Sequence, residues 1–125
     1  MDSFKKINDT FGHATGDWVL KTVCHTVKAQ LRKTEVIGRL GGEEFAICLP
    51  TYLEEEVKAL AERCRAAIEA IDTNPSGFSF LITASFGIAT RGNGGSCSFE
   101  ETLAAADKAL YFSKNEGRNR VSAYQ

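Results

Sequence analysis

The chain has 125 residues, of which 43% are hydrophobic and 25% charged, a balance typical of a single soluble domain. Its net charge of −1 gives no global attraction to nucleic acid, which argues against a template-binding polymerase. No apolar run approaches the ~20 residues of a membrane span and residues 1–6 lack a signal-peptide core, so we expect a cytoplasmic domain without membrane contact, whose longer parent protein could still be anchored.

The first half of the chain predicts a helix and a hairpin. After a short N-terminal strand, apolar side chains recur at helical spacing over residues 16–33 and indicate an amphipathic helix. Strand-like runs at 36–40 and 44–49 flank Gly41-Gly42, and a tight primed turn needs the positive φ that glycine adopts without steric cost. The hairpin implies antiparallel pairing.

The second half alternates helices and strands, with a capping box before each helix. The expected elements are a helix starting near 52–54 and ending before 74–77, a strand over 78–89, a helix from Ser98 to about Asn115 capped by Gly117, and an edge strand over 121–124. Helices and strands therefore mix in one domain. The expected fold class is α/β (α+β), with a mostly antiparallel central sheet and flanking helices.

The cysteines do not predict a metal site. They form no Cys-x-x-Cys pair, and the two histidines add no cluster. The fourth cysteine is Cys97, and the other three fall at apolar positions and are expected to be buried free thiols: Cys24, Cys48 and Cys64.

The hairpin turn carries the strongest chemical signal. Gly41 and Gly42 allow a ligand to approach the backbone closely, and Glu43 and Glu44 follow directly. Glycines that admit a phosphate beside hard oxygen ligands for Mg²⁺ are what nucleotide chemistry needs. The alternative is an ordinary hairpin with solvated glutamates.

Two further pairs of residues suit a nucleotide. Asn8 and Asp17 offer the donors and acceptors that pair with the edge of guanine, although they also suit a turn and a helix start. Lys114 and Arg118 suit the clamping of a triphosphate, although cations are common at helix C-termini.

Taken together, four motifs closely resemble the GGDEF family, the diguanylate cyclases. They stand in family order and spacing over essentially the whole chain: Phe4-Lys-Lys-Ile-Asn-Asp-Thr-Phe-Gly-His-x-x-Gly-Asp17, Gly41-Gly-Glu-Glu-Phe45, Ser85-Phe-Gly-Ile-Ala89, and Ala106-Asp-Lys-Ala-Leu-Tyr111 with Lys114 and Gly117-Arg-Asn119. The resemblance implies a fold like that of class III nucleotidyl cyclases and polymerase palm domains. It also implies the joining of two GTP into cyclic di-GMP, with release of two pyrophosphates, by a homodimer whose subunits each hold one GTP.

The resemblance also assigns roles to the candidate site residues. Glu43 would bind Mg²⁺ or Mn²⁺, with Glu44 close to the site, and Asn8 and Asp17 would bind guanine. The residues expected to contact the phosphates, or to let them approach, are Ser3, Phe4, Lys5, Gly41, Gly42, Lys114 and Arg118. An inhibitory product site would comprise Arg32, Glu35 and Arg63, with Glu35 standing where the family pattern has aspartate.

One departure from the family pattern bears on activity. The pattern places a metal-binding aspartate one residue before Met1, so we expect a domain without its N-terminal helix and most of its first strand. The parent protein is then a cyclase, while the 125-residue chain is weak or inactive. The alternative function is a non-catalytic module of the same fold that binds GTP or cyclic di-GMP.

Overall fold

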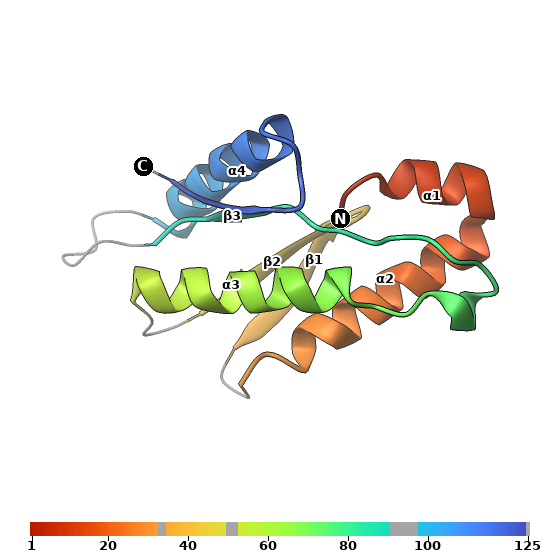
Figure 1. The fold of residues 1–125 in the computed structure, drawn as a ribbon. Helices are drawn as coiled ribbons and strands as arrows, with labels where there is room; N and C mark the ends of the chain where they lie inside the picture. Colours follow the sequence, from red (N-terminus) through yellow and green to blue (C-terminus); the bar gives the residue numbers. More distant parts are fainter. Residues whose placement is uncertain (33–34, 50–52, 91–97, 125) are drawn as a thin grey trace.

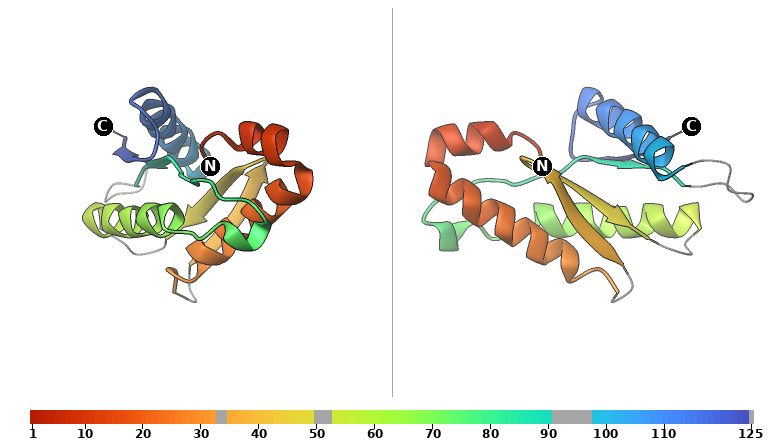
Figure 2. Two further views of the ribbon diagram at one scale, coloured as in Figure 1. Left: turned by 45° about the vertical axis from the view of Figure 1, so that its right-hand side comes forward. Right: turned by 180° about the vertical axis from the view of Figure 1, so that it is seen from behind.

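The computed structural model describes residues 1–32, 35–49, 53–90 and 98–124. Helices surround two small sheets, and the N-terminus lies near the tip of the hairpin (Figures 1 and 2). The elements, in chain order, are α1 (Phe4–Phe11), α2 (His13–Lys28), β1 (Val36–Gly41), β2 (Glu44–Cys48), α3 (Glu54–Glu69), the 3₁₀ turn η1 (Asn74–Ser76), β3 (Phe86–Ile88), α4 (Phe99–Asn115) and β4 (Val121–Ala123).

The strands form one antiparallel and one parallel pair. β1 and β2 make the predicted hairpin, in which Val36 lies opposite Cys48 and the register shifts between Arg39 and Gly41. β3 and β4 pair in parallel and are connected through α4, as parallel strands require a crossover. The prediction of mixed helices and strands is confirmed, and antiparallel pairing holds for the hairpin.

The strand expected over 78–89 is much shorter in the structure. Only Phe86–Ile88 forms a ladder, because no other strand of the described chain pairs with the residues before it. That segment is nevertheless anchored, since the Asp2 N–H donates to the Thr83 carbonyl over 2.9 Å. Its apolar alternation is also kept, because Ile82 and Ala84 are buried.

The N-terminus is helical where a short strand was expected. Phe4, Ile7 and Phe11 recur at helical spacing, Ile7 is buried, and the ring of Phe11 stacks on that of Phe80 with centroids 4.6 Å apart. Packing on this one face explains the helix. The predicted helix over 16–33 begins earlier, at His13, and ends at Lys28.

The other helix ends follow the sequence signals. The Ser98 hydroxyl accepts the Glu101 N–H over 3.1 Å at the start of α4, and Gly117 has a φ of +121° after its end. At the start of α3 the Glu56 carboxylate accepts the Leu53 N–H over 3.1 Å. Thr51, the expected cap, lies outside the described residues.

The core lies between α2, α3 and the segment that leads into β3. Its most deeply buried members are Val19, Cys64, Ile68 and Ile82. The prediction of a buried thiol is therefore confirmed for Cys64, but it is wrong for Cys48, which is exposed at the open end of the hairpin. Cys24 is half-buried, and Cys97 lies outside the described residues. Within the described part of the chain, no helix is long and apolar enough to cross a membrane.

Helix α4 packs directly on β3 because Gly87 has no side chain. A Cβ built on Gly87 would lie 2.1 Å from the Ala106 carbonyl oxygen and 2.3 Å from the Leu110 nitrogen. These are backbone atoms of α4, which can move only if the whole helix moves. Gly87 therefore sets the distance between α4 and β3.

Gly87→Ala is expected to destabilise the domain by about 1–3 kcal/mol, since overpacking forces backbone shifts. Gly38→Ala is the matched control, because its new Cβ would meet nothing within 4 Å and should change stability by no more than about 0.5 kcal/mol. Urea unfolding of both variants measures the difference. Equal stability of the two variants would contradict the close packing of α4 on β3.

Candidate functional site

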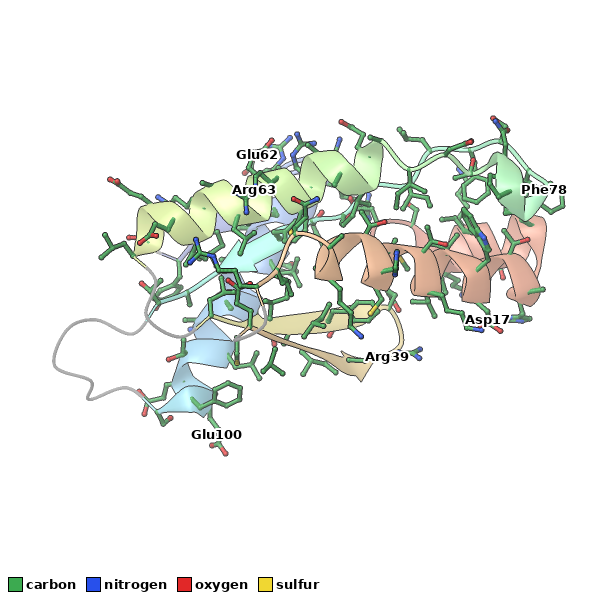
Figure 3. All side chains as sticks on the ribbon, turned by 90° about the horizontal axis from the view of Figure 1, so that it is seen from below. Asp17, Arg39, Glu62, Arg63, Phe78 and Glu100 are labelled. Carbon is green, nitrogen blue, oxygen red and sulfur yellow. The ribbon has the colours of Figure 1, made fainter. Side chains whose placement is uncertain are left out.

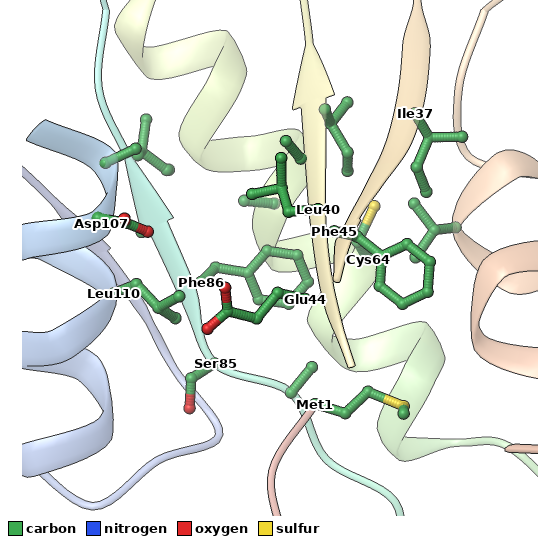
Figure 4. Close-up of a pocket in the computed structure, with 18 of the residues that line it drawn as sticks. Met1, Ile37, Leu40, Glu44, Phe45, Cys64, Ser85, Phe86, Asp107 and Leu110 are labelled. Carbon is green, nitrogen blue, oxygen red and sulfur yellow. The ribbon is translucent and has the colours of Figure 1, made fainter. Parts of the chain in front are cut away.

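A cavity of about 220 Å³ lies between the hairpin on one side and β3 and α4 on the other (Figure 4). Apolar side chains such as Ile37, Phe45, Phe86 and Leu110 form much of its wall. Polar groups reach it from the hairpin, from the residue before β3 and from α4: Glu43, Glu44, Ser85, Asp107 and Lys114.

Charges of both signs meet at this cavity. The Met1 amine donates to the Glu43 carbonyl over 3.3 Å, and its pKa is lowered, chiefly by burial. Lys114 lowers the pKa of this amine further, whereas Glu43 and Glu44 raise it. The Met1 amine therefore interacts electrostatically with Glu43, Glu44 and Lys114. The expected metal carboxylates and an expected phosphate cation thus lie close together.

The glycine turn lies exposed at the end of the hairpin. Gly41 has a φ of +154° and Gly42 a φ of +52°, which confirms the prediction of positive φ. The turn itself lies one residue later than expected, because Gly41 pairs with Glu44 as the last residue of β1 and Gly42 and Glu43 connect the strands. A Cβ at either position would meet nothing within 4 Å, so the surface above the turn is open to a ligand. The Arg39 Nε donates to the Gly42 carbonyl over 2.7 Å and fixes the turn from the β1 side.

The donor set fits a metal that arrives with a nucleotide. Among the residues that the structure describes, no three or more His, Cys, Asp or Glu side chains gather in a group that could hold a metal ion by themselves. Glu43 and Glu44 supply two carboxylates at the cavity. Mg²⁺ commonly binds through one or two carboxylates and completes its shell with water and substrate phosphates.

Asn8 and Asp17 lie at the corner between α1 and α2. A Cβ built on Gly16 would lie 1.7 Å from the Asn8 Oδ1, so the Asn8 amide lies directly against the backbone beside Asp17. Asp17 itself is exposed on the outer side of α2 (Figure 3). The corner thus places the Asn8 side chain against Gly16, the residue that precedes Asp17, and Gly16 provides the space.

The expected phosphate-binding residues come from two elements near the cavity. Ser3 and Lys5 are exposed and Phe4 is half-buried, all at the start of α1. Lys114 lies in the last turn of α4 and lines the cavity. Arg118 is exposed in the loop that follows and has a φ of +62°.

The three residues of the expected product site lie around the start of β1 and on α3. The Arg32 N–H donates to the Glu35 carboxylate, and the Glu35 N–H donates to the Arg32 carbonyl over 3.1 Å. Arg63 is exposed on α3 (Figure 3). Burial raises the pKa of the neighbouring Cys64 thiol, with Arg63 lowering it and Glu35 raising it, so both charges lie near this thiol.

Sequence reasoning assigned no role to Asp2, which the structure places at the centre of a hydrogen-bond network. Its carboxylate is only 6% exposed and accepts hydrogen bonds from Thr83, Ser85 and the Asn119 backbone. A carboxylate just before the Ser3-Phe4 helix start was the available signal. The partners are distant in sequence and could not be read from it.

Comparison with known proteins identifies a family and relatives for the chain. The family model "Diguanylate cyclase, GGDEF domain" matches residues 1–120. The chain is 45% identical over 123 residues to the diguanylate cyclase DgcP of Pseudomonas aeruginosa. The alignment spans 97% of this chain but only 18% of that protein. The curated relative is thus much longer than the chain.

Solved structures match as well. The GGDEF domain of DgcB from Caulobacter crescentus, crystallised with c-di-GMP, is 36% identical with a TM-score of 0.90, covering 98% of this chain and 72% of that one. The active GGEEF domain of a diguanylate cyclase from Vibrio cholerae is 29% identical with a TM-score of 0.82, and the match covers 99% of this chain and 78% of that one. Its motif name has the same letters as Gly41–Phe45. The chain belongs to the GGDEF family of diguanylate cyclase domains.

The burial of Cys64 beside Arg63 predicts a difference in thiol reactivity. At pH 8 iodoacetamide is expected to alkylate the exposed Cys48 readily, whereas Cys64 stays protected because its pKa is raised and its sulfur is covered. Peptide mapping by mass spectrometry assigns the alkylated residues, and unfolding in urea should abolish the difference. Alkylation of Cys64 at the rate of Cys48 in the folded chain would contradict this packing.

Proposed function

We propose that this domain, within its longer protein, joins two GTP molecules into cyclic di-GMP with release of two pyrophosphates. The observation that carries the proposal is the meeting of Glu43, Glu44 and Lys114 at one cavity, beside a glycine turn open to ligand. Family membership and the shared GGEEF motif support it.

Guanine is bound at the corner between α1 and α2 in this proposal. The Asp17 carboxylate accepts hydrogen bonds from the N1–H and N2–H₂ groups of the base, and the Asn8 amide N–H donates a hydrogen bond to O6 or N7. This pairing explains selectivity for GTP over ATP, since adenine has an acceptor at N1 and no amino group at C2. The close fit of Asn8 against Gly16 supports it.

The triphosphate lies over the Gly41–Gly42 turn and meets cations on its far side. Lys114 and Arg118 hold the β- and γ-phosphates, with further contacts from Ser3, Phe4 and Lys5 at the start of α1. Glu43 holds Mg²⁺ or Mn²⁺, with Glu44 nearby, and the metal supplies charge neutralisation at the phosphates. Catalysis is then chiefly positioning and charge stabilisation.

Turnover requires two chains. Each chain offers one guanine corner and one phosphate-binding turn, so it holds one GTP. Joining two GTP into a symmetric ring needs each 3′-hydroxyl to face the α-phosphate of the other nucleotide, which a face-to-face homodimer provides. The rate per chain should therefore rise with protein concentration. Because its substrate is GTP, the reaction takes place in the cytoplasm.

Cyclic di-GMP acts as an inhibitor at a second site in this proposal. Arg32 and Arg63 would hold its guanine and phosphate groups through charge-assisted hydrogen bonds, and Glu35 would take the role of the aspartate in the family pattern. The effect of both Arg63 and Glu35 on the Cys64 thiol supports their proximity.

Glu43→Gln should lose the Mg²⁺ dependence of GTP binding, because the amide keeps the shape but not the charge that holds the metal. We expect binding in Mg²⁺ to weaken by about tenfold, measured by isothermal titration calorimetry with GTP and, for comparison, ATP. Glu55→Gln, an exposed glutamate on α3, is the control and should bind as the unsubstituted chain does.

The same preparations, at high concentration, are assayed for cyclic di-GMP by mass spectrometry. Less product is expected for Glu43→Gln than for the unsubstituted chain, because the amide does not carry the charge that holds the metal. Equal affinity for GTP and ATP together with no product would contradict the proposed function. Specific GTP or cyclic di-GMP binding without product would identify a binding module.

Gly16→Ala should weaken GTP binding by displacing the Asn8 amide, whose Oδ1 would lie 1.7 Å from the new Cβ. The obstructing atom is the end of a flexible side chain, so the domain should fold while its affinity for GTP falls by about tenfold, the value of one or two hydrogen bonds. In an Asn8→Ala background the same substitution should cost nothing further. Additive losses in the double variant would show that Gly16 acts elsewhere.

A further inference from the structure

The buried carboxylate of Asp2 connects three segments that are far apart in the sequence. Its Oδ2 accepts hydrogen bonds from the Thr83 hydroxyl over 2.8 Å and the Asn119 N–H over 3.0 Å, and its Oδ1 accepts one from the Ser85 hydroxyl over 2.6 Å. A buried charge is tolerated only when it is bonded in this way.

The loop that Asp2 reaches has an unusual backbone. Gly117, Arg118 and Asn119 have φ values of +121°, +62° and +47°. Two consecutive non-glycine residues with positive φ are uncommon and persist only where the surroundings hold them. The conformation of this loop decides where the Arg118 side chain points.

Asn119 is the fixed point of the loop. Its N–H donates to Asp2, while its side chain accepts from the Arg65 guanidinium over 2.9 Å and donates to the Glu69 carboxylate on α3. One residue earlier, the Arg118 N–H donates to the Ser113 carbonyl over 2.9 Å. Arg118 is thus held on both sides while its own side chain is exposed.

Met1, the residue before Asp2, lines the cavity. The Met1 amine donates to the carbonyl of Glu43, so the chain passes from the hairpin turn to the Arg118 loop within two residues. Asp2 therefore lies between the expected metal-binding turn and an expected phosphate cation, and it fixes the second relative to the first.

We propose that Asp2 is a positioning residue that holds the Gly117–Asn119 loop in its left-handed conformation and so directs Arg118 toward the triphosphate. The inference rests on the proposed function for the identity of the ligand. It does not rest on that function for the loop itself, which can be tested without nucleotide.

Hydrogen exchange measured by NMR tests the loop directly. Asp2→Ala should raise the exchange rate of the Asn119 amide by about tenfold, the equivalent of one charge-assisted hydrogen bond. Asp2→Asn keeps the shape and an uncharged acceptor, so the exchange rate of its Asn119 amide should lie between those of the unsubstituted chain and Asp2→Ala. If Asp2→Ala does not fold, Asp2→Asn alone tests the loop, and its Asn119 amide should exchange faster than in the unsubstituted chain. Thr83→Val is the control, because it removes one bond to Asp2 and leaves the Asn119 bond in place. Unchanged exchange at Asn119 in the Asn and Ala variants would overturn the proposal.

Nucleotide binding tests the consequence. In Mg²⁺, Asp2→Ala should weaken the binding of GTP by about tenfold. It should leave the affinity for GMP unchanged, because GMP lacks the β- and γ-phosphates. In an Arg118→Ala background Asp2→Ala should cost no further GTP affinity. An equal loss for GTP and GMP, or the same loss with and without the Arg118 side chain, would reduce Asp2 to a structural role and overturn the inference. If the unsubstituted chain binds neither nucleotide, the proposed function fails, while the Asn119 amide still decides whether Asp2 holds the loop.

Discussion

The contact between α4 and β3 at Gly87 is the constraint on which the rest of the site depends. Backbone meets backbone there, because a Cβ would lie within 2.1 Å of the Ala106 carbonyl oxygen. This contact sets the height of α4 above the sheet. The last turn of α4 carries Lys114 to the cavity, and the loop after it carries Arg118 and Asn119. A shift of α4 would therefore move every expected phosphate contact on that side together.

Side chains of both charge signs line the cavity before any ligand arrives. Glu43 and Glu44 face it from the hairpin, and Asp107 and Lys114 from α4. A triphosphate alone would be repelled by the carboxylates, and a divalent cation alone would find no group of three ligands able to hold it in the described part of the chain. Bound together, the metal and the phosphates satisfy both sets of charges, which accounts for a site that suits a metal nucleotide better than either partner.

Much of this arrangement could be predicted from local sequence, and the remainder depends on contacts between distant segments. The Gly41-Gly42 turn and the ends of α4 follow from glycine and serine chemistry, which acts within a few residues. The helix α1 was overlooked because its polar residues dominate the pattern, although Phe4, Ile7 and Phe11 mark one apolar face. The strand expected over 78–89 was too long, because β-propensity does not reveal whether a partner strand lies alongside.

The candidate site shows the same division. The four motifs marked Asn8, Asp17, Glu43 and Lys114, and the structure places the first two at the α1–α2 corner and the last two at the cavity. Asp2 could not be predicted, because its role arises from hydrogen bonds to residues more than 80 positions away, such as Thr83, which lies 81 positions along the chain, and Asn119, which lies 117. Cys48 was misjudged for a related reason, since an apolar position in a hairpin is buried only where another element covers it.

A crystal structure of the chain with Mg²⁺ and a non-hydrolysable GTP analogue would test the central claim most directly. The account predicts guanine between Asn8 and Asp17, the triphosphate over the Gly41–Gly42 turn, the metal on Glu43, and Lys114 and Arg118 on the terminal phosphates. Nucleotide bound away from the hairpin turn, or a triphosphate that contacts neither Glu43 through the metal nor Lys114, would contradict it.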